Sequence, residues 1–549
     1  MGAGLLIIAV IIVLIAYRLY GSYIASILKL DDTKPTPAFE QNDGVDYVPT
    51  KYPVLLGHHF ASIAGAGPIV GPIIALAYGW LPAYLWILIG VIFIGAVHDF
   101  TSIVASVRHQ GKSIGEIIEH RLGVVGKRLF LAFSWATLVL VVAVFLDVVA
   151  KTFVHNGSVS TASSLFIFIA LIFGMLIYRL KLSLGIASLL GLFLLSLCII
   201  LGLNFPLSLS YNTWIFLLMI YIFIASVLPV WVLLQPRDYL NSFLLYALML
   251  GAFVGIFFFL PDLHVAPVKQ FSHPALGPLF PILFITVACG AISGFHSLVG
   301  SGTTSKQLEK ESDAKKIGYG GMLIEGILAV IAIIAGATLV GSEFDAMFAE
   351  RKFIPIFATG VSKFLSAIPL LNISESAGKT FTSLAVAAFA LTSLDTATRL
   401  ARFTVQEFFE SEHFLNTPLK HFTNRYVATG MTVIAGAVLL LSGGALKLWP
   451  LFGSANQLLA ALALLAVTVW LSYRRSNYKI TLIPMIFMYL VTGSTLILLI
   501  KKNLLDSFHP VLALISVLLL LLAIILAVQS YRRIKSYNLA KDTLVTEKK

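Results

Sequence analysis

The chain has 549 residues, of which 58% are hydrophobic and only 12% are charged, and its formal net charge at pH 7 is +12. Soluble proteins carry roughly 25% charged residues, so this composition excludes an ordinary soluble domain and predicts a membrane protein. The basic residues lie between apolar segments and therefore predict membrane orientation, not a nucleic-acid partner.

Apolar segments follow one another along the whole sequence. About fifteen of them approach the roughly 20 residues that a helix needs to cross a bilayer, so the sequence predicts an all-α polytopic membrane protein. In chain order these segments are 3–24, 57–79, 82–107, 127–150, 161–179, 183–203, 213–234, 240–260, 279–300, 318–341, 380–398, 426–442, 447–471, 480–500 and 509–530.

The connecting segments predict the orientation. With the N-terminus outside, alternate connections hold about 29 of the 38 lysines and arginines, so we expect a cytoplasmic C-terminus. Five helices in 57–203 and five in 213–398 begin on opposite sides, which favours a ten-helix inverted-repeat core. We expect residues 1–56 to form an extra helix and a cytoplasmic loop, 57–408 the transport core, and 409–549 extra helices and a cytoplasmic tail.

The first core segment contains the most unusual stretch. Residues 57–72 hold two histidines, a serine, four glycines and two prolines. Proline lacks an N–H donor and glycine lowers helix propensity, so the helix should break near Gly65 to Pro68. Free backbone groups at membrane depth are tolerated only against protein, water or solute. The break therefore predicts a substrate or ion site, with a simple proline kink as the alternative.

Polar residues inside apolar segments are functional candidates, because each costs a few kcal/mol to place in a bilayer. His58 and His59 precede the break and could carry a coupling proton, or bond to a freed carbonyl group as neutral side chains. Ser293, His296 and Ser297 share one helix face, which suits a cation site and also interhelical hydrogen bonding. The spacing alone favours hydrogen bonding.

Acidic residues in apolar segments suggest two further roles. Glu325 has no basic residue within a helical turn, so its carboxyl group could exchange a proton. Asp99 follows His98 and could join a proton relay. Asp395 precedes Arg399 by four residues, the favourable order for an intrahelical ion pair, which predicts a gate or structural role.

Motifs for enzymatic chemistry are missing from the sequence. It contains no HExxH, P-loop or GxSxG motif and no cysteine cluster. We therefore predict neither an enzyme, nor a cofactor, nor a metal site. An intramembrane haem or metal enzyme is the least favoured alternative.

Several motifs resemble the signature of the carbon starvation protein A (CstA) family, and they keep their order along most of the chain. They include Gly57-His58-His59-Phe60-Ala61-Ser62-Ile63-Ala64-Gly65-Ala66-Gly67-Pro68, Gly95-Ala96-Val97-His98-Asp99-Phe100, Gln235-Pro236-Arg237-Asp238, Ser293-Gly294-Phe295-His296-Ser297 and Trp449-Pro450-Leu451-Phe452-Gly453-Ser454-Ala455-Asn456-Gln457. One departure is His98, because many members have glutamine at this position.

The resemblance implies a bacterial inner-membrane transporter that imports peptides or pyruvate during carbon starvation, driven by protons or another cation. It also implies a relationship to the amino acid–polyamine–organocation superfamily, with an inverted-repeat (LeuT-like) core and a broken first helix. A passive channel and a nutrient sensor are the alternatives. The implied partners are a small-molecule substrate, a proton or sodium ion and the lipid bilayer.

The candidate residues fall into three groups. For substrate binding they are His59, Ser62, Gly65, Ala66, Gly67, Pro68, Ser293 and His296. For ion or proton coupling they are His58, Asp99, Ser297 and Glu325. For a gate or a structural pair they are Arg237, Asp238, Asp395 and Arg399.

Overall fold

The computed structural model describes residues 1–410, 417–443, 445–506 and 510–546. These residues are mostly helical, as the sequence predicts. The strands found among them are β1 (Ser272–His273) and β2 (Gly277–Pro278), which pair antiparallel in a short hairpin.

Eleven helices in the described residues are long and apolar enough to cross a membrane, and one bent pair raises the number to twelve. The predicted segments 213–234, 279–300 and 426–442 are instead shorter or interrupted helices. These eleven long helices contain α1 (Gly2–Arg18) with α2 (Tyr20–Leu28), α6 (Trp80–Gly90) with α7 (Ala96–Val107), α9 (Val124–His155), α10 (Gly157–Gly174), α11 (Leu184–Asn204), α13 (Leu234–Phe259), α17 (Gly321–Ala337), α20 (Glu375–Phe409), α23 (Ala445–Tyr473), α24 (Lys479–Lys501) and α25 (Pro510–Thr546).

The predicted break in the first core segment is confirmed. Helix α4 (Tyr52–Ile63) and helix α5 (Gly67–Ala75) are separated by residues 64–66 and bent by 41°. Pro68 lies in the first turn of α5, where its missing N–H removes no helical hydrogen bond. The sequence therefore both ends the first half-helix and starts the second.

A second interruption divides the predicted segment 279–300. It consists of α14 (Leu279–Thr286), α15 (Ala288–Ala291) and α16 (Gly294–Gly302). Ile292 and Ser293 are extended, with φ of −162° and −138°. The expectation that Ser293 shares a continuous helix face with His296 is therefore wrong, because α16 begins only after Ser293.

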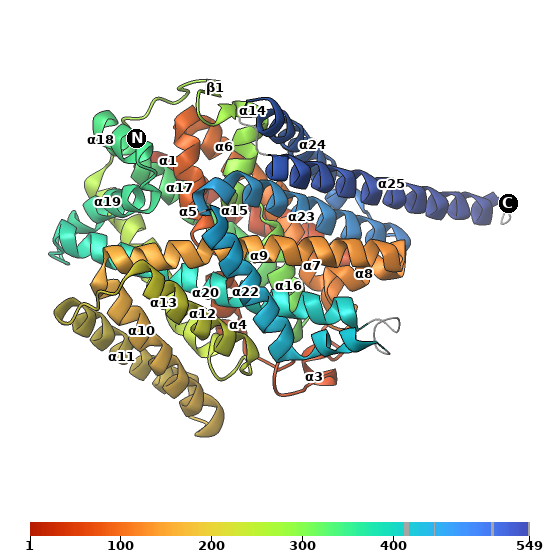
Figure 1. The fold of residues 1–549 in the computed structure, drawn as a ribbon, viewed down its shortest axis with the longest axis horizontal. Coiled ribbons are helices and arrows are strands. Elements are labelled where there is room, and N and C mark those ends of the chain that lie inside the picture. The colour runs from red at the N-terminus through yellow and green to blue at the C-terminus, as the bar shows by residue number, and fades with distance from the viewer. Residues whose placement is uncertain (411–416, 444, 507–509, 547–549) are drawn as a thin grey trace.

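The two interrupted segments lie at the centre of the helix packing. Helix α5 packs against α15 and α17, α4 against α13, and α16 against α7 and α23. The long helices α9 and α20 pack along each other beside them. Figure 1 shows α10 and α11 at one edge of the molecule and α25 extending from the opposite side.

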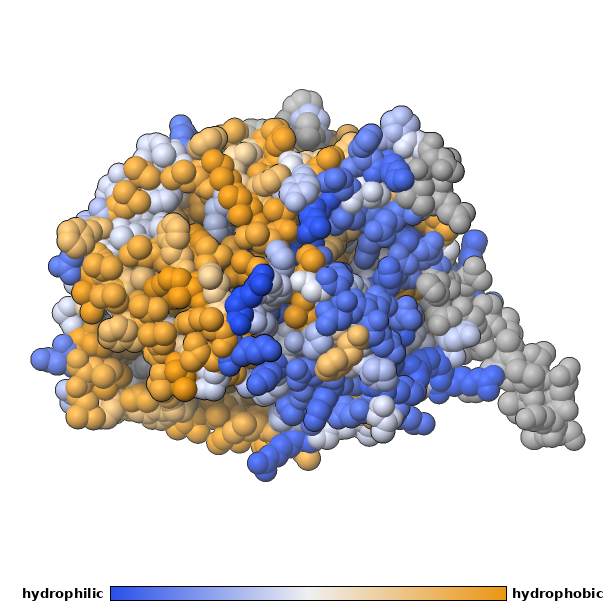
Figure 2. Space-filling view, turned by 90° about the horizontal axis from the view of Figure 1, so that it is seen from below, coloured by the Kyte–Doolittle hydropathy of each residue, from blue (hydrophilic) through white to orange (hydrophobic). Residues whose placement is uncertain are grey.

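Segments that the sequence places on one side of the membrane contact one another. The backbone N–H of Thr50 donates to the carbonyl of Gln307 (3.0 Å), and the Tyr47 hydroxyl donates to the carbonyl of Gln110 (3.3 Å). Figure 2 shows that hydrophilic residues gather over one part of the face viewed from below, whereas hydrophobic residues cover the other part. This division is expected for a membrane protein with an apolar belt and a polar end.

Candidate functional site

The two interruptions meet through closely packed small residues. A Cβ atom at Gly67 would lie 2.4 Å from Sγ of Cys289, which belongs to α15. A Cβ atom at Gly65 would lie 2.5 Å from Oγ of Ser393 in α20 and 3.1 Å from the Phe145 ring in α9. Glycine is therefore required at both positions by close contact with neighbouring helices.

Hydroxyl groups donate hydrogen bonds to backbone carbonyls at and just before the first interruption. Ser393 donates from Oγ to the carbonyl of Ser62 (2.9 Å), and Ser62 donates from Oγ to the carbonyl of His58 (2.7 Å). The Ser62 hydroxyl also lies 3.2 Å from that of Thr396. The predicted substrate-binding positions Gly65, Ala66, Gly67 and Pro68 are all buried, so the structure holds this region closed.

Two adjacent carboxamides of α23 satisfy the second interruption. The Asn456 side chain accepts a hydrogen bond from the N–H of Phe295 (2.9 Å) and donates one to Oγ of Ser293 (3.0 Å). Gln457 donates from Nε2 to the carbonyl of Ile292 (3.0 Å). Sequence reasoning did not select these two residues as site residues, although adjacent carboxamides in an apolar helix are a detectable signal.

An acidic and histidine-rich cluster lies next to the second interruption. We call it the α7–α16–α17 cluster, and it contains His98 and Asp99 of α7, His296 of α16 and Glu325 of α17. Nδ1 of His98 lies 2.7 Å from Oδ1 of Asp99, and Nδ1 of His296 lies 3.0 Å from Oδ2. Nε2 of His296 lies 3.6 Å from Oε2 of Glu325, slightly too far for a hydrogen bond. None of the four residues is more than 1% exposed.

The α7–α16–α17 cluster contains no permanent positive charge. In the part of the chain that the structure describes, neither Asp99 nor Glu325 forms an ion pair with lysine or arginine, and both Glu325 oxygens lack a hydrogen-bond partner. Two buried carboxylates without a fixed cation are very costly when both are ionised. This arrangement can bind and release protons.

His59 belongs to the first half-helix, α4, and its ring lies against the start of α17. Its Nδ1 atom lies 2.7 Å from Oγ1 of Thr304, and a Cβ atom at Gly321 would lie 3.5 Å from its ring. The Nε2 atom of His59 is buried and has no hydrogen-bond partner among the described residues. Ser297 instead donates to the carbonyl of Gly294 (2.7 Å) in its own helix.

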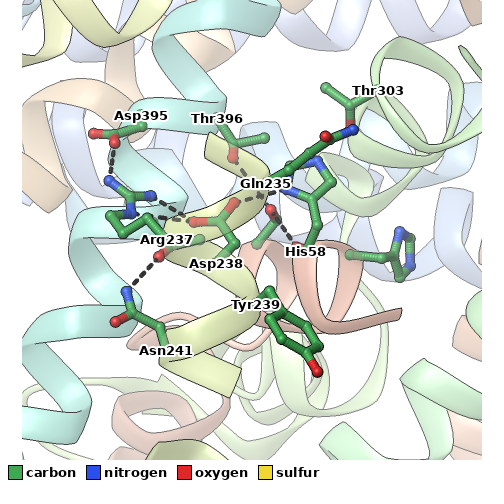
Figure 3. Close-up of polar contacts among 12 residues, drawn as sticks. His58, Gln235, Arg237, Asp238, Tyr239, Asn241, Thr303, Asp395 and Thr396 are labelled. Carbon is green, nitrogen blue, oxygen red and sulfur yellow. Dashed lines mark hydrogen bonds and ion pairs between the residues drawn. The ribbon is translucent and has the colours of Figure 1, made fainter. Parts of the chain in front are cut away.

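His58 belongs to a different cluster, which Figure 3 shows. We call it the α4–α13–α20 cluster. Nδ1 of His58 lies 2.7 Å from Oδ2 of Asp238, and Arg237 donates to Oδ1 of the same carboxylate (2.7 Å). Arg237 also forms an ion pair with Asp395, to which the Tyr221 hydroxyl donates (2.5 Å). All five side chains lie among helices, and four come from residues selected in the sequence.

The predicted intrahelical pair between Asp395 and Arg399 is wrong. Asp395 is paired with Arg237 of another helix, whereas Arg399 donates to the carbonyl of Ala225 (2.8 Å) and to Asp46 (2.7 Å). The i to i+4 spacing is compatible with a pair, but each side chain finds a partner across the helix interface. Sequence spacing could not reveal those partners.

Asp46 is the acidic partner of two buried arginines. Its carboxylate contacts Arg399 at 2.7 Å and Arg402 at 3.1 Å, and it lies in the loop that leads into α4. Burial alone would raise the pKa of the Asp46 carboxyl. The positive charges of Arg402, Arg399 and Lys306 outweigh this effect, so the pKa lies below the usual aspartate value. The loop is thereby fixed to α20.

The structure thus separates residues that the sequence analysis grouped together. Asp99, His296 and Glu325 meet in one cluster, whereas His58 belongs to the other. Sequence reasoning did not identify five further members of these polar networks: Asp46, Tyr221, Thr304, Asn456 and Gln457.

Comparisons with known proteins agree with one another. The family model described as carbon starvation protein CstA matches residues 1–354 and 344–495. The peptide transporter CstA of Campylobacter jejuni is 35% identical, covering 89% of this chain and 79% of that protein. The peptide transporter CstA of Bacillus subtilis is 34% identical over 88% of each chain. The pyruvate/proton symporter BtsT of Escherichia coli is 34% identical over 88% of this chain and 80% of that protein.

Among solved structures, a manganese transporter of Eremococcus coleocola aligns with 90% of this chain and 99% of that chain. The sequence identity is 15% and the TM-score is 0.47.

Proposed function

Since the chain belongs to the carbon starvation protein CstA family and is a multi-pass membrane transporter, we propose that it imports peptides or pyruvate together with protons. The observation that carries this proposal is the α7–α16–α17 cluster. It is buried, contains Asp99 and Glu325 without a lysine or arginine partner among the described residues, and lies one turn from the second interruption. Protonation there changes the charge beside the region where the two helices break.

A proton bound to this cluster offers a physical basis for coupling. Buried charge is unfavourable, so the protonated cluster tolerates a closed, dry site better than the deprotonated one. Glu325 and His296 belong to different helices, and a proton between them favours their close approach. Opening to water favours proton release, which links the proton to movement of α16 against α17.

We also propose an inverted repeat, with a grouping that differs from the sequence expectation. One repeat contains α4 with α5, α6 with α7, α9, α12 (Tyr211–Val227) and α13. The other contains α14 to α16, α17, α20, α22 (Arg425–Gly443) and α23.

The packing supports this grouping. Helix α4 packs on α13 as α16 packs on α23, and α9 packs on α12 as α20 packs on α22. In the same way, α5 packs on α17 and α16 packs on α7. The hairpin of α10 and α11 is then an insertion at the edge of the first repeat. The transport core would extend to α23, beyond the expected boundary at residue 408.

The substrate region is proposed to lie between the interruptions. The N-terminus of α5, at Gly67, carries the positive end of the helix dipole and favours a carboxylate. Both a peptide and pyruvate offer that group, and relatives are named for each. Because residues 64–68 are buried in this structure, substrate entry requires the surrounding helices to separate.

We propose a bacterial inner-membrane location with an external N-terminus and a cytoplasmic C-terminus. The excess of lysine and arginine in one set of connections supports this orientation. The family description supports a role during carbon starvation.

The test is uptake of radiolabelled pyruvate and dipeptide by proteoliposomes under an imposed pH gradient. We expect wild type to concentrate one solute, and Glu325→Gln to lose concentrative uptake by about tenfold or more while still equilibrating the solute. The matched control is Asp147→Asn, which removes a carboxyl group of α9 that is paired with Lys151 and Tyr211. We expect this control to retain coupled uptake.

Other outcomes distinguish the remaining functions. Equilibration without concentration by wild type would indicate a passive channel. Binding without uptake of either solute would favour a nutrient sensor. A coloured cofactor in the absorption spectrum of the purified protein would instead indicate an intramembrane haem or metal enzyme.

A further inference from the structure

The Asn456–Gln457 pair of α23 caps the N-terminus of a different helix, α16. Ser293 is the N-cap residue of α16, but its own side chain does not accept a hydrogen bond from the first turn. The acceptor for the N–H of Phe295 is Oδ1 of Asn456, at 2.9 Å. An orphan N–H at a helix start normally finds such an acceptor on the N-cap side chain itself.

The same pair also binds Ile292 and Ser293, the two residues that form the second interruption. Gln457 donates to the carbonyl of Ile292 (3.0 Å), and Asn456 donates to Oγ of Ser293 (3.0 Å). Both carboxamides are fully buried. Helix α23 therefore holds the two extended residues and the first turn of α16 at the same time.

Close backbone packing adds to this hold. A Cβ atom at Gly294 would lie 2.2 Å from the carbonyl oxygen of Asn456 and 2.5 Å from the nitrogen of Ala460. Only glycine allows α16 to start this close to α23. The position of the α16 N-terminus is consequently set by α23.

His296 follows Phe295 directly, so its imidazole moves with this first turn. It faces Asp99 and His98 of α7 and Glu325 of α17, while His59 of α4 contributes a further titratable ring nearby. The His296–Glu325 separation of 3.6 Å lies at the edge of hydrogen bonding. A small displacement of the turn is enough to make or break that contact.

We propose that Asn456 and Gln457 are positioning residues that hold the second interruption and thereby place His296 between Asp99 and Glu325. This inference rests on the proposed function, because it assigns the two carboxamides to the proton-binding cluster. It also gives α23, which the sequence analysis placed outside the transport core, a role in positioning the α7–α16–α17 cluster.

The test compares three variants of the full chain. Asn456→Ala removes the acceptor, Asn456→Asp keeps a side-chain oxygen for the Phe295 N–H, and Thr468→Ala is the matched control. Thr468 is fully buried on the same helix, but it bonds to Leu464 and Thr481, away from the break. Gln457→Ala provides a second positioning variant if Asn456→Ala does not fold.

The first measurement is amide hydrogen exchange of the peptide that spans residues 288–300 in purified protein. We expect Asn456→Ala to accelerate exchange about tenfold, Asn456→Asp to restore most of the protection, and Thr468→Ala to leave it unchanged. Unchanged exchange in Asn456→Ala and Gln457→Ala would overturn the proposal.

The second measurement is the difference in Tm between about pH 5.5 and about pH 8, where histidine changes charge. The His296→Gln variant shows how much of this pH-dependent difference in Tm comes from the α7–α16–α17 cluster. We expect Asn456→Ala to approach the His296→Gln value, whereas a purely structural change would lower both Tm values equally. If Asn456→Ala accelerates amide exchange but keeps the wild-type difference in Tm between the two pH values, the cap does not position His296.

These readouts do not depend on transport. If wild type transports neither solute but Asn456→Ala changes both exchange and the pH difference, the positioning role stands and the transport proposal fails. If His296→Gln itself leaves the pH difference unchanged, the cluster does not bind protons in this range, and the positioning proposal is overturned with it.

Discussion

The α4–α13–α20 cluster and the α7–α16–α17 cluster are both buried and polar, but they differ in their charge balance. In the α4–α13–α20 cluster, Arg237 lies between Asp238 and Asp395 and contacts both carboxylates. In the α7–α16–α17 cluster, the ion-pair partners of Asp99 and Glu325 within the described part of the chain are histidines. The charged and histidine side chains of both clusters are at most 1% exposed, so the difference in charge balance is not compensated by water.

This difference matches the proposed division between a structural role and a coupling role. A fixed guanidinium charge holds its carboxylates together at every physiological pH, because arginine does not lose its proton. A cluster of carboxyl and imidazole groups has no such fixed charge and responds to pH. His58 and His59 are adjacent in α4, yet His58 contacts Asp238 of the α4–α13–α20 cluster, whereas His59 lies near Asp99 and His296 of the α7–α16–α17 cluster.

Removing the shared guanidinium should produce the largest loss of stability. Arg237→Met leaves two buried carboxylates without their cation, so we expect a loss of about 3–5 kcal/mol of unfolding free energy, or no folded protein. The measurement is the yield and Tm in detergent. The matched rescue is Arg237→Met combined with Asp238→Asn and Asp395→Asn, which should recover much of the loss. Equal stability of wild type and Arg237→Met would contradict a structural role for this cluster.

A smaller effect is expected at the loop that leads into α4. Asp46→Asn removes the carboxylate partner of Arg399 and Arg402, and we expect a loss of about 2 kcal/mol above pH 5. Because the folded-state pKa of Asp46 is lowered, its contribution is fully present above the unfolded-state pKa of about 4 and is lost as pH falls through the folded value.

The measurement for this loop is Tm as a function of pH. Wild type and Asp46→Asn should differ most near neutral pH and converge in acid. Asp43→Asn is the matched control, because Asp43 accepts hydrogen bonds only from backbone N–H groups in its own turn, including those of Val45 and Tyr47. A constant difference between wild type and Asp46→Asn at every pH would contradict the ion-pair explanation.

The sequence predicted the helical membrane class and the first interruption because both follow from local composition. Glycines and prolines at residues 65–72 break a helix wherever it lies, and the structure places the break at residues 64–66. The second interruption was not predicted, because Ile292 and Ser293 are not helix breakers. Carboxamides 161–165 residues away, at Asn456 and Gln457, stabilise it, and such a long-range contact leaves no local pattern.

The ion pairs show the same limit. Spacing correctly identified Asp395 and Arg399 as buried charged residues of one helix, but their partners lie on other segments, at Arg237 and Asp46. In contrast, Glu325 has no lysine or arginine near it in sequence, and the described structure brings none to it from other segments. The absence of a nearby lysine or arginine in sequence was informative because no lysine or arginine of another described segment pairs with it either; its nearest basic group is the imidazole of His296, at 3.6 Å.

The unpaired glutamate should give the smallest change in stability. Glu325→Gln retains the shape of the side chain, and the wild-type oxygens make no hydrogen bond that could be lost. We therefore expect a change within about 1 kcal/mol near pH 6, and a relative gain at higher pH, because ionisation of a buried carboxyl group without a cation is unfavourable.

Glu311→Gln is the matched control, because Glu311 forms an ion pair with Arg108 at 2.6 Å and is equally shielded from solvent in its loop. The same substitution should destabilise the protein there, because it weakens an existing pair. Comparing the two Tm values at both pH values tests the charge-balance argument directly. If Glu325→Gln destabilises the protein as much as Glu311→Gln does, Glu325 has a structural partner, and the contrast between the two clusters would no longer hold.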